Sequence, residues 1–320
     1  MMDLFDLRDP DVYPEILRLR SSPPPAENSP NWLLETRAWI GAQYIPTPDT
    51  ERLRQLYGVV RAGCIGQKRQ WLGLNSPPVT GKSEMLCHFM LDIVESSGTP
   101  WRSRVDGWSH LPCIYVKASS RQQGRGILKA ISRFAGLDQR GDEDDLMYRL
   151  IQRLPLLQTQ VIVLDDAHNF RRASDVATTL TDSLRNIITL PVTFVMAGAR
   201  LEESALLKQT QVRFHESAEQ LRRRHTGMGL ESMVLPESNA EFRNLCMAFG
   251  RRVRAIPGLT TSGLSDPKTL QRLNRRCGSM PGRALGTLKQ ATALAIEGDR
   301  DVTTERIIAS LPDDEQKWHT

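Results

Sequence analysis

The stretch SPPVTGKS, residues 76–83, is the part of the sequence that decides the fold. Its last three residues, GKS, match the end of the phosphate-binding pattern G-x-x-x-x-G-K-[ST]. The apolar run QWLGLN, residues 70–75, precedes it, and a segment with helical periodicity, residues 82–97, follows it. Because the first turn of a helix presents backbone N–H groups to an anion, this position between a strand and a helix favours a phosphate site.

The loop departs from the pattern at its first position, where Ser76 replaces glycine. The two prolines that follow remove backbone donors, but the donors nearest to a bound phosphate come from later residues of the loop. In such a loop the lysine, here Lys82, reaches the β- and γ-phosphates, and the hydroxyl, here that of Ser83, binds Mg²⁺. The expected nucleotide contacts of the loop are Ser76, Val79, Thr80, Gly81, Lys82, Ser83 and Glu84.

A second motif, VIVLDD at residues 161–166, places two carboxylates directly after four apolar residues. The C-terminal end of a buried parallel strand is where nucleotide-hydrolysing proteins of this type hold Mg²⁺ through a water molecule. We therefore expect Asp165 to serve the metal and Asp166 to orient or deprotonate the attacking water. The alternative is that the two aspartates only cap a helix at a strand end. Both motifs in this order favour ATP with Mg²⁺ as the ligand.

Continuous apolar runs alternate with helical segments through the middle of the chain, which is typical of a parallel sheet covered on both faces. We predict an α/β fold with a P-loop core, a five-stranded parallel sheet and a C-terminal helical domain. The expected domains are an N-terminal arm at 1–66, a core at 67–236 and a helical domain at 237–320. The first 30 residues of the arm would be a flexible arm or a docking segment. The expected strands are 70–75, 111–119, 160–168, 191–199 and 229–238, and the expected helices are 82–97, 124–137, 142–154, 174–190, 239–255, 266–277, 281–297 and 303–311, with further helix within 31–66.

The composition is that of an ordinary globular protein, with 40% hydrophobic and 25% charged residues. No apolar stretch approaches the roughly 20 residues that span a bilayer, and the acidic N-terminus lacks a secretory apolar region, so we expect a cytoplasmic protein without a membrane partner. The five cysteines have no metal-ligand spacing. The net charge is +5, and residues 200–289 hold a surplus of Lys and Arg that attracts polyanions or forms a solvated helix face.

Several segments in order resemble AAA+ ATPases, and among them the transposition regulators of the TniB, TnsC and Mu B type. The phosphate loop and VIVLDDAHNF (161–170) resemble the two nucleotide motifs of this family. PVTFVMAGAR (191–200) resembles its sensor strand, and QLRRRHTGMGLESMVLPES (220–238) resembles its arginine-containing segment. ETRAWIGAQYIPTP (35–48) resembles its adenine-contacting segment, and GSMPGRALGTLKQATALAI (278–296) resembles its lid helix.

The resemblance implies further site residues. Ile40, Tyr44 and Ile45 would contact adenine, and Arg283 on the lid helix would sense the nucleotide. An arginine from a neighbouring subunit would stabilise the γ-phosphate charge, and Arg223 and Arg224 are equal candidates for this catalytic role beside Lys82 and Asp166. Duplex DNA would be held through its phosphates by Lys117, Arg121 and Arg125 in KASSRQQGRG (117–126). A plain soluble connection remains the alternative for that loop.

Three departures from the family pattern predict slow hydrolysis rather than lost binding: Ser76 for glycine, Asp166 for glutamate, and Ala199 in place of a polar sensor. The resemblance implies an ATP-binding protein that forms a ring or filament on DNA without strong sequence preference. It would recruit a D-D-E transposase together with a target-selection protein. The alternatives are a nucleotide-switched signalling or defence ATPase, a helicase-loader-like ATPase, and a scaffold that binds nucleotide without hydrolysing it.

Overall fold

The computed structural model describes residues 9–63, 71–75, 77, 80–105, 107–119, 124–171, 186–199, 201, 225–229, 239–278 and 280–311. The chain divides into two compact units. One, here the helical unit, comprises residues 1–47, 79–81 and 232–320, and the other, here the sheet unit, comprises residues 48–78 and 82–231. The predicted boundaries at 66/67 and 236/237 stay a proposal.

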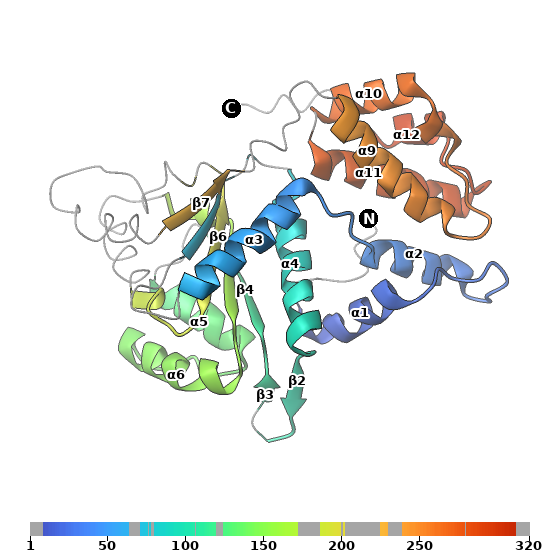
Figure 1. Cartoon of the computed structure of the whole chain (residues 1–320). Helices are drawn as coiled ribbons and strands as arrows, with labels where there is room; N and C mark the ends of the chain where they lie inside the picture. The colour runs from blue at the N-terminus through green and yellow to red at the C-terminus, as the bar shows by residue number, and fades with distance from the viewer. Residues whose placement is uncertain are drawn as a thin grey trace. The chain divides into compact units, whose positions relative to one another are not determined.

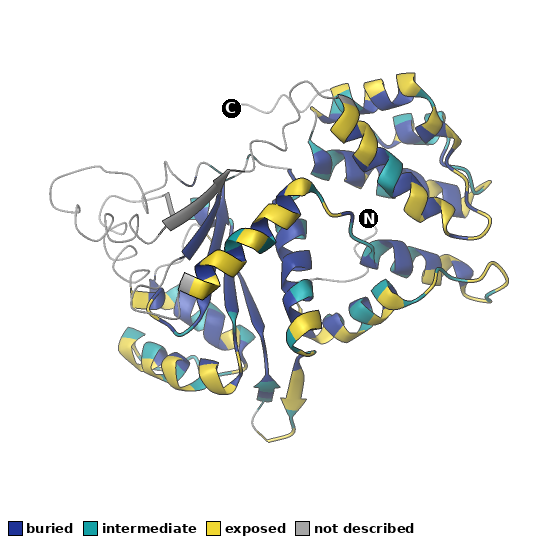
Figure 2. Ribbon diagram, viewed as in Figure 1, coloured by how far each residue is buried: buried dark blue, intermediate teal, exposed yellow. Residues whose placement is uncertain are grey.

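The sheet unit contains the predicted five-stranded parallel sheet (Figure 1). The strand order is β4-β5-β6-β1-β7, and every neighbouring pair is parallel. β5 and β6 are buried at every residue (Figure 2), as expected for strands covered on both faces. The strands are β1 (Trp71–Asn75), β4 (Cys113–Lys117), β5 (Val161–Asp165), β6 (Thr193–Gly198) and β7 (His225–Gly229).

The fifth strand lies earlier than the sequence predicts. We expected it at residues 229–238, where apolar residues gather, but β7 has the sequence HTGMG and pairs with β1 from Trp71↔His225 onward. Two glycines in five residues give this strand a poor intrinsic propensity, so its pairing with β1 makes it a strand. Residues 230–238 lie outside the described part of the chain.

Helices cover the sheet as the apolar periodicity predicts. α3 (Pro48–Gly63) packs against β1 and β7, α4 (Lys82–Ser97) packs against β4 and β5, and α5 (Gly124–Phe134) packs against β4. α6 (Glu143–Leu156) packs on α5 and begins with a capping box between Asp142 and Asp145. The predicted helix 174–190 falls mostly on residues that lie outside the described part.

The sequence missed a small antiparallel hairpin formed by β2 (Trp101–Ser103) and β3 (Gly107–His110). Its strands are too short for a periodic signal. The short 3₁₀ helices η1 (Pro10–Val12), η2 (Ala167–Arg171) and η5 (Ser262–Ser265) complete the connections. Burial raises the pKa of the Cys113 thiol, and it raises that of Cys246 to about 12, so both are protonated core residues.

The helical unit joins the two ends of the chain. α1 (Tyr13–Ser21) packs on α2 (Trp32–Ala42), and α2 packs on α11 (Pro281–Glu297). The other helices are α9 (Asn239–Arg254), α10 (Pro267–Cys277) and α12 (Thr304–Ala309), which confirm the predicted C-terminal helices. One buried cluster combines Trp39 and Ile40 of α2 with residues of all four C-terminal helices, among them Phe249 and Leu288.

The expectation of a flexible arm over the first 30 residues is wrong for residues 10–21, which form η1 and α1. Tyr13 and Ile16 are fully buried, and Pro10 begins the first turn, where a missing N–H costs nothing. Tertiary burial, which the local composition does not reveal, therefore orders this segment. No described helix is both long enough and apolar enough to cross a membrane.

We predict that Ile16→Ala lowers the free energy of unfolding by about 2–5 kcal/mol, because it leaves a cavity at a fully buried position. The measurement is a urea unfolding curve followed by circular dichroism. Leu34→Ala removes the same kind of side chain from an exposed position on α2 and serves as the control, with an expected change below about 0.5 kcal/mol. Equal curves for the two variants would mean that α1 is not packed.

Candidate nucleotide-binding site

The loop between β1 and α4 turns sharply at Gly81, whose φ of 88° lies in the left-handed region. Glycine adopts this conformation without a steric penalty, so the residue type is matched to the turn. α4 begins immediately afterwards at Lys82, and its first turn contains Ser83 and Glu84. The turn therefore delivers the lysine and the hydroxyl to the carboxyl edge of the sheet.

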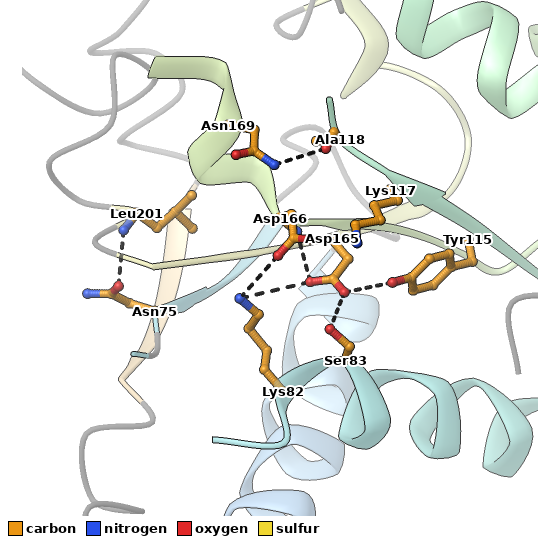
Figure 3. A network of polar contacts seen from close by, with 10 residues as sticks. All are labelled: Asn75, Lys82, Ser83, Tyr115, Lys117, Ala118, Asp165, Asp166, Asn169 and Leu201. Carbon is orange, nitrogen blue, oxygen red and sulfur yellow. Dashed lines mark hydrogen bonds and ion pairs between the residues drawn. The ribbon is translucent and has the colours of Figure 1, made fainter. Parts of the chain in front are cut away.

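Asp165, the last residue of β5, is the centre of a polar network at that edge (Figure 3). Its side chain is 1% exposed. Its Oδ2 accepts hydrogen bonds from the Ser83 hydroxyl at 2.5 Å and from the Tyr115 hydroxyl at 2.6 Å. Its Oδ1 accepts the Asp166 N–H at 2.8 Å. A buried carboxylate needs such donors, because an unpaired charge in a core is strongly destabilising.

Two lysines balance the two aspartates. Lys82 Nζ lies 4.0 Å from Asp165 Oδ1 and 3.8 Å from Asp166 Oδ1, and the lysine is itself buried at 8% exposure. Lys117, at the end of β4, places its Nζ 3.4 Å from Asp166 Oδ2. Lys117 pairs with Asp165 across the β4–β5 ladder, and this register brings its side chain to the site.

Asp166 adopts a left-handed backbone with φ of 56°, which non-glycine residues rarely do. Aspartate tolerates this conformation better than most residues because its short side chain bonds locally. The turn directs the Asp166 carboxylate toward Lys82 and Lys117 in place of a continuation of the strand (Figure 3). Strained positions of this kind gather at functional sites.

The oxygen atoms of Ser83 and Asp165 fit a magnesium ion in chemistry and spacing. Mg²⁺ prefers hydroxyl, carboxylate and water oxygens, and neighbouring ligands of an octahedral ion with 2.0–2.1 Å bonds lie about 2.9 Å apart. The two oxygens lie 2.5 Å apart, so Ser83 would bind the ion directly, and Asp165 would bind it through a water molecule or, after a shift of a few tenths of an ångström, directly. Mg²⁺ takes few protein ligands in nucleotide sites, and the described residues contain no cluster of three or more His, Cys, Asp or Glu that would suggest another metal.

The structure thus brings together Lys82, Ser83, Asp165 and Asp166, as their motifs predict. Thr80 of the loop is buried at 2% exposure. Lys117 lies beside Asp166, and its predicted contact with DNA stays a prediction. The remaining predicted residues that fall outside the described part of the chain are Ser76, Val79, Arg121, Arg223 and Arg224.

The other described residues of the predicted site belong to other elements. Ile40 and Ile45 are buried in the hydrophobic cluster of the helical unit, and Tyr44 is half-buried. Arg283 lies in the first turn of α11. Arg125, in the first turn of α5, donates to the Gly141 carbonyl at 2.6 Å. Their assigned contacts with adenine, nucleotide and DNA stay predictions.

Sequence reasoning missed three polar residues around the site. Tyr115 of β4 bonds Asp165, and Asn169 of η2 donates to the Ala118 carbonyl at 3.1 Å. Asn75, the last residue of β1, accepts the Leu201 N–H at 3.0 Å and so ties the start of the loop to the end of β6, next to Ala199. The only feature of the sequence that could have indicated these three residues is a polar side chain in or directly after an apolar strand.

The comparisons with known proteins agree with this geometry. Residues 74–207 match an AAA domain family, a segment that contains both nucleotide motifs. No curated protein sequence matches the chain.

Solved structures of AAA+ proteins resemble the chain over most of its length. The ORC1 protein of Aeropyrum pernix in complex with DNA has a TM-score of 0.55 and 18% identity, over 88% of this chain and 66% of that one. The ADP form of ORC2 from the same organism has a TM-score of 0.54 and 13% identity, over 84% and 70%. Domain III of the replication initiation protein DnaA from Thermotoga maritima has a TM-score of 0.52 and 11% identity, over 84% and 93%. The chain therefore has the AAA+ P-loop fold, with a parallel α/β core and C-terminal helices.

We predict that Tyr115→Phe lowers the free energy of unfolding by about 1–3 kcal/mol, because the buried Asp165 carboxylate loses a donor. Urea unfolding measures the effect. Tyr148→Phe, on the exposed face of α6, is the matched control and should leave stability unchanged. In a double-mutant cycle with Asp165→Asn, a coupling energy near zero would contradict the proposed hydrogen bond.

Proposed function

We propose that this chain is an ATP-binding AAA+ protein that assembles with copies of itself on duplex DNA and there recruits a transposase. The observation that carries the nucleotide part is the meeting of Lys82 and Ser83 with Asp165 and Asp166 at one edge of the sheet. In an α/β sheet this edge is where ligands bind. The DNA and transposase parts rest on the resemblance of the sequence segments and on the chain's surplus of cations.

The residues have separate tasks in the proposed reaction. The backbone N–H groups of the Gly81 turn hold the phosphates, and Lys82 exchanges its two carboxylate partners for phosphate oxygens. Ser83 and Asp165 would hold Mg²⁺, which would supply positive charge to the phosphates when bound. Asp166 accepts a hydrogen bond, and then the proton, from the attacking water.

Hydrolysis should be slow, and the geometry gives a reason. Asp166 is one methylene shorter than the glutamate usual in this family, and Lys117 lies 3.4 Å from its carboxylate. This ion pair must open before that carboxylate oxygen can accept a proton from the attacking water. This pair also favours the second candidate, a nucleotide-bound scaffold that does not turn over.

Assembly would complete the site. An arginine from the next subunit, Arg223 or Arg224, would stabilise charge on the γ-phosphate.

The proposed role of Arg283 is supported by the composition of the helical unit, which groups residues 79–81 with α11. Within this unit, a Cβ atom added to Gly81 would lie 3.4 Å from the Cα atom of Gly282. The phosphate-loop turn therefore adjoins the residue before Arg283.

Lys117 links the proposed nucleotide and DNA functions. Its side chain is 55% exposed although its Nζ pairs with Asp166, so the cation can reach an acceptor in solvent. Asn169 fixes Ala118, the next residue of the same connection, to the segment that follows Asp166. A DNA phosphate that captures Lys117 would free the Asp166 carboxylate, so DNA binding should stimulate hydrolysis.

A transposase is the proposed partner of the DNA-bound assembly. ORC1 of Aeropyrum pernix was solved with DNA, which shows that DNA binding is compatible with this fold without assigning it to this chain. A target-selection protein would act on the same assembly. A D-D-E recombinase gene beside the gene for this chain would strengthen this part of the proposal.

We predict that Asp166→Asn binds ATP as tightly as the wild-type protein but releases phosphate at least about a hundredfold more slowly, because it removes the base. Lys82→Ala should abolish binding of both ATP and ADP, because it removes the phosphate cation. Calorimetry measures affinity, and a phosphate-release assay measures turnover. Loss of ATP binding in Asp166→Asn would contradict the assigned role, and absent turnover in the wild-type protein would support the scaffold.

We predict that Lys117→Gln raises the basal rate of phosphate release and removes its stimulation by DNA. Without Lys117, the Asp166 carboxylate is not held in an ion pair with β4. It is therefore available to the water from the start, and DNA has no ion pair to open. Arg133→Gln, at the exposed C-terminal end of α5 and outside the 117–126 connection, is the control for a lost positive charge in the sheet unit. A Lys117→Gln protein that DNA still stimulates as strongly as the wild type would refute the link.

A further inference from the structure

The surface formed by α9 and α10 carries an unusual excess of positive charge. Residues 239–278 contain eight Lys or Arg and only two carboxylates, Glu241 and Asp266. Seven of the cations are exposed. Arg254 donates to the Thr261 hydroxyl, and the other six define what is here called the basic surface: Arg243, Arg251, Arg252, Lys268, Arg272 and Arg275. Asp266 is already committed, because it caps α10 by accepting the N–H groups of Lys268 and Thr269.

Elsewhere in the same unit, arginines are paired with acids. Ion pairs join Arg37 to Glu297, Arg300 to Glu27 and Arg306 to Asp299. By contrast, among the described residues no carboxylate forms an ion pair with the arginines of the basic surface. Charge compensation within the fold therefore does not account for this surface.

Helix stability does not account for all of it either. Cations in a last turn, such as Arg251 and Arg275, favour the helix dipole. Lys268 is the second residue of α10, where the dipole disfavours a cation, and it stands four residues before Arg272, a like-charged neighbour on the same helix face. Asp266 attracts Lys268 and offsets part of this cost, but no described carboxylate does so for Arg272, so an external anion is the simplest reason for the pair.

A groove between the two helices supplies a seat for such an anion. It has a volume of about 280 Å³ and is lined by Arg243 of α9 and by Lys268, Gln271 and Asn274 of α10, over the apolar Phe242 and Leu270. Arg243 and Lys268 thus approach one space from different helices. Arg272 and Arg275 continue along α10, so the cations extend beyond a single anion and match a chain of phosphates.

The composition of the surface favours nucleic acid over a protein partner. Protein interfaces depend on exposed aromatic and aliphatic anchors. The exposed large apolar side chains of the described residues lie on α2, α3, α6, α11 and the β2–β3 hairpin, and none lies on α9 or α10. A polar, strongly positive surface without such anchors is typical of phosphate-backbone contacts. Figure 2 shows how much of α9 and α10 is exposed.

We infer that the basic surface of α9 and α10 is a DNA-backbone docking surface, separate from the 117–126 connection of the sheet unit. The inference rests on the DNA partner of the proposed function. It assigns that partner a second contact, on the helical unit, without base recognition. Binding through it is electrostatic and therefore depends on salt through the number of phosphates contacted.

The test is the triple variant Arg243→Gln, Lys268→Gln, Arg272→Gln, compared with the wild-type protein for binding of a random-sequence duplex in ATP and Mg²⁺. Each phosphate contact contributes about 0.9 to the slope of log affinity against log salt, so the slope should fall by about 2–3. Affinity at low salt should fall at least about tenfold, equally for all sequences. ATP affinity and the circular dichroism spectrum should match those of the wild type.

The control variant is Arg104→Gln, Arg133→Gln, Arg140→Gln, which removes three exposed cations from the sheet unit. Both variants have the same net charge, so a difference between them reports position alone. A triple variant with the wild-type salt slope, or a control with the same loss, overturns the inference. A triple variant that loses binding to poly-glutamate but binds DNA as the wild type does also overturns the inference and assigns the surface to an acidic protein. A wild-type protein that binds no duplex at low salt refutes the DNA part of the proposed function itself.

Discussion

The Asp165 carboxylate is charged but only 1% exposed, so the fold must surround it with hydrogen-bond donors and a cation. This requirement constrains every element of the site. The hydroxyls of Ser83 and Tyr115 come from two different elements, and the cation comes from Lys82. Removing one partner of a buried ion pair is far more costly than removing an exposed one. The turn at Gly81, the β4–β5 register and the end of β5 must therefore form together, which makes the site a structural element of the core as well as a binding site.

The sequence predicted best what depends on continuous burial and on residues adjacent in the chain. β1, β4, β5 and β6 are apolar along most of their length and were located within two residues or so of their predicted ends, except where the prediction overran into a loop. The predictions for β7 and for the segment that forms α1 failed for one shared reason. HTGMG is a strand because it lies beside β1, and α1 is ordered because Tyr13 and Ile16 are buried, so in both cases distant contacts decide what local composition does not.

The candidate site divides in the same way. Lys82, Ser83, Asp165 and Asp166 could be predicted because parallel strands bring their carboxyl ends to one edge of a sheet. Tyr115 and the pairing of Lys117 with Asp166 could not, because they depend on which strand lies next to β5 and in which register. The same composition that suggested a DNA contact for Lys117 is equally compatible with a lysine that pairs with a carboxylate. The register decides that Lys117 pairs with a carboxylate, and its DNA contact stays a prediction.

Charge balance explains why nucleotide binding and assembly should be coupled in such a protein. In the network at the sheet edge, Lys82 and Lys117 balance Asp165 and Asp166. A triphosphate adds several negative charges to a site that is already neutral, so binding needs positive charge from outside the network. A metal ion supplies part of it, and Arg283 and an arginine of a neighbouring subunit are the proposed sources of the rest. The exposed cations of α9 and α10 are the opposite case, because there the protein supplies the positive charge and the proposed DNA would supply the negative charge. Anions would complete both proposed sites, and the binding of ligand at both would weaken as the salt concentration rises.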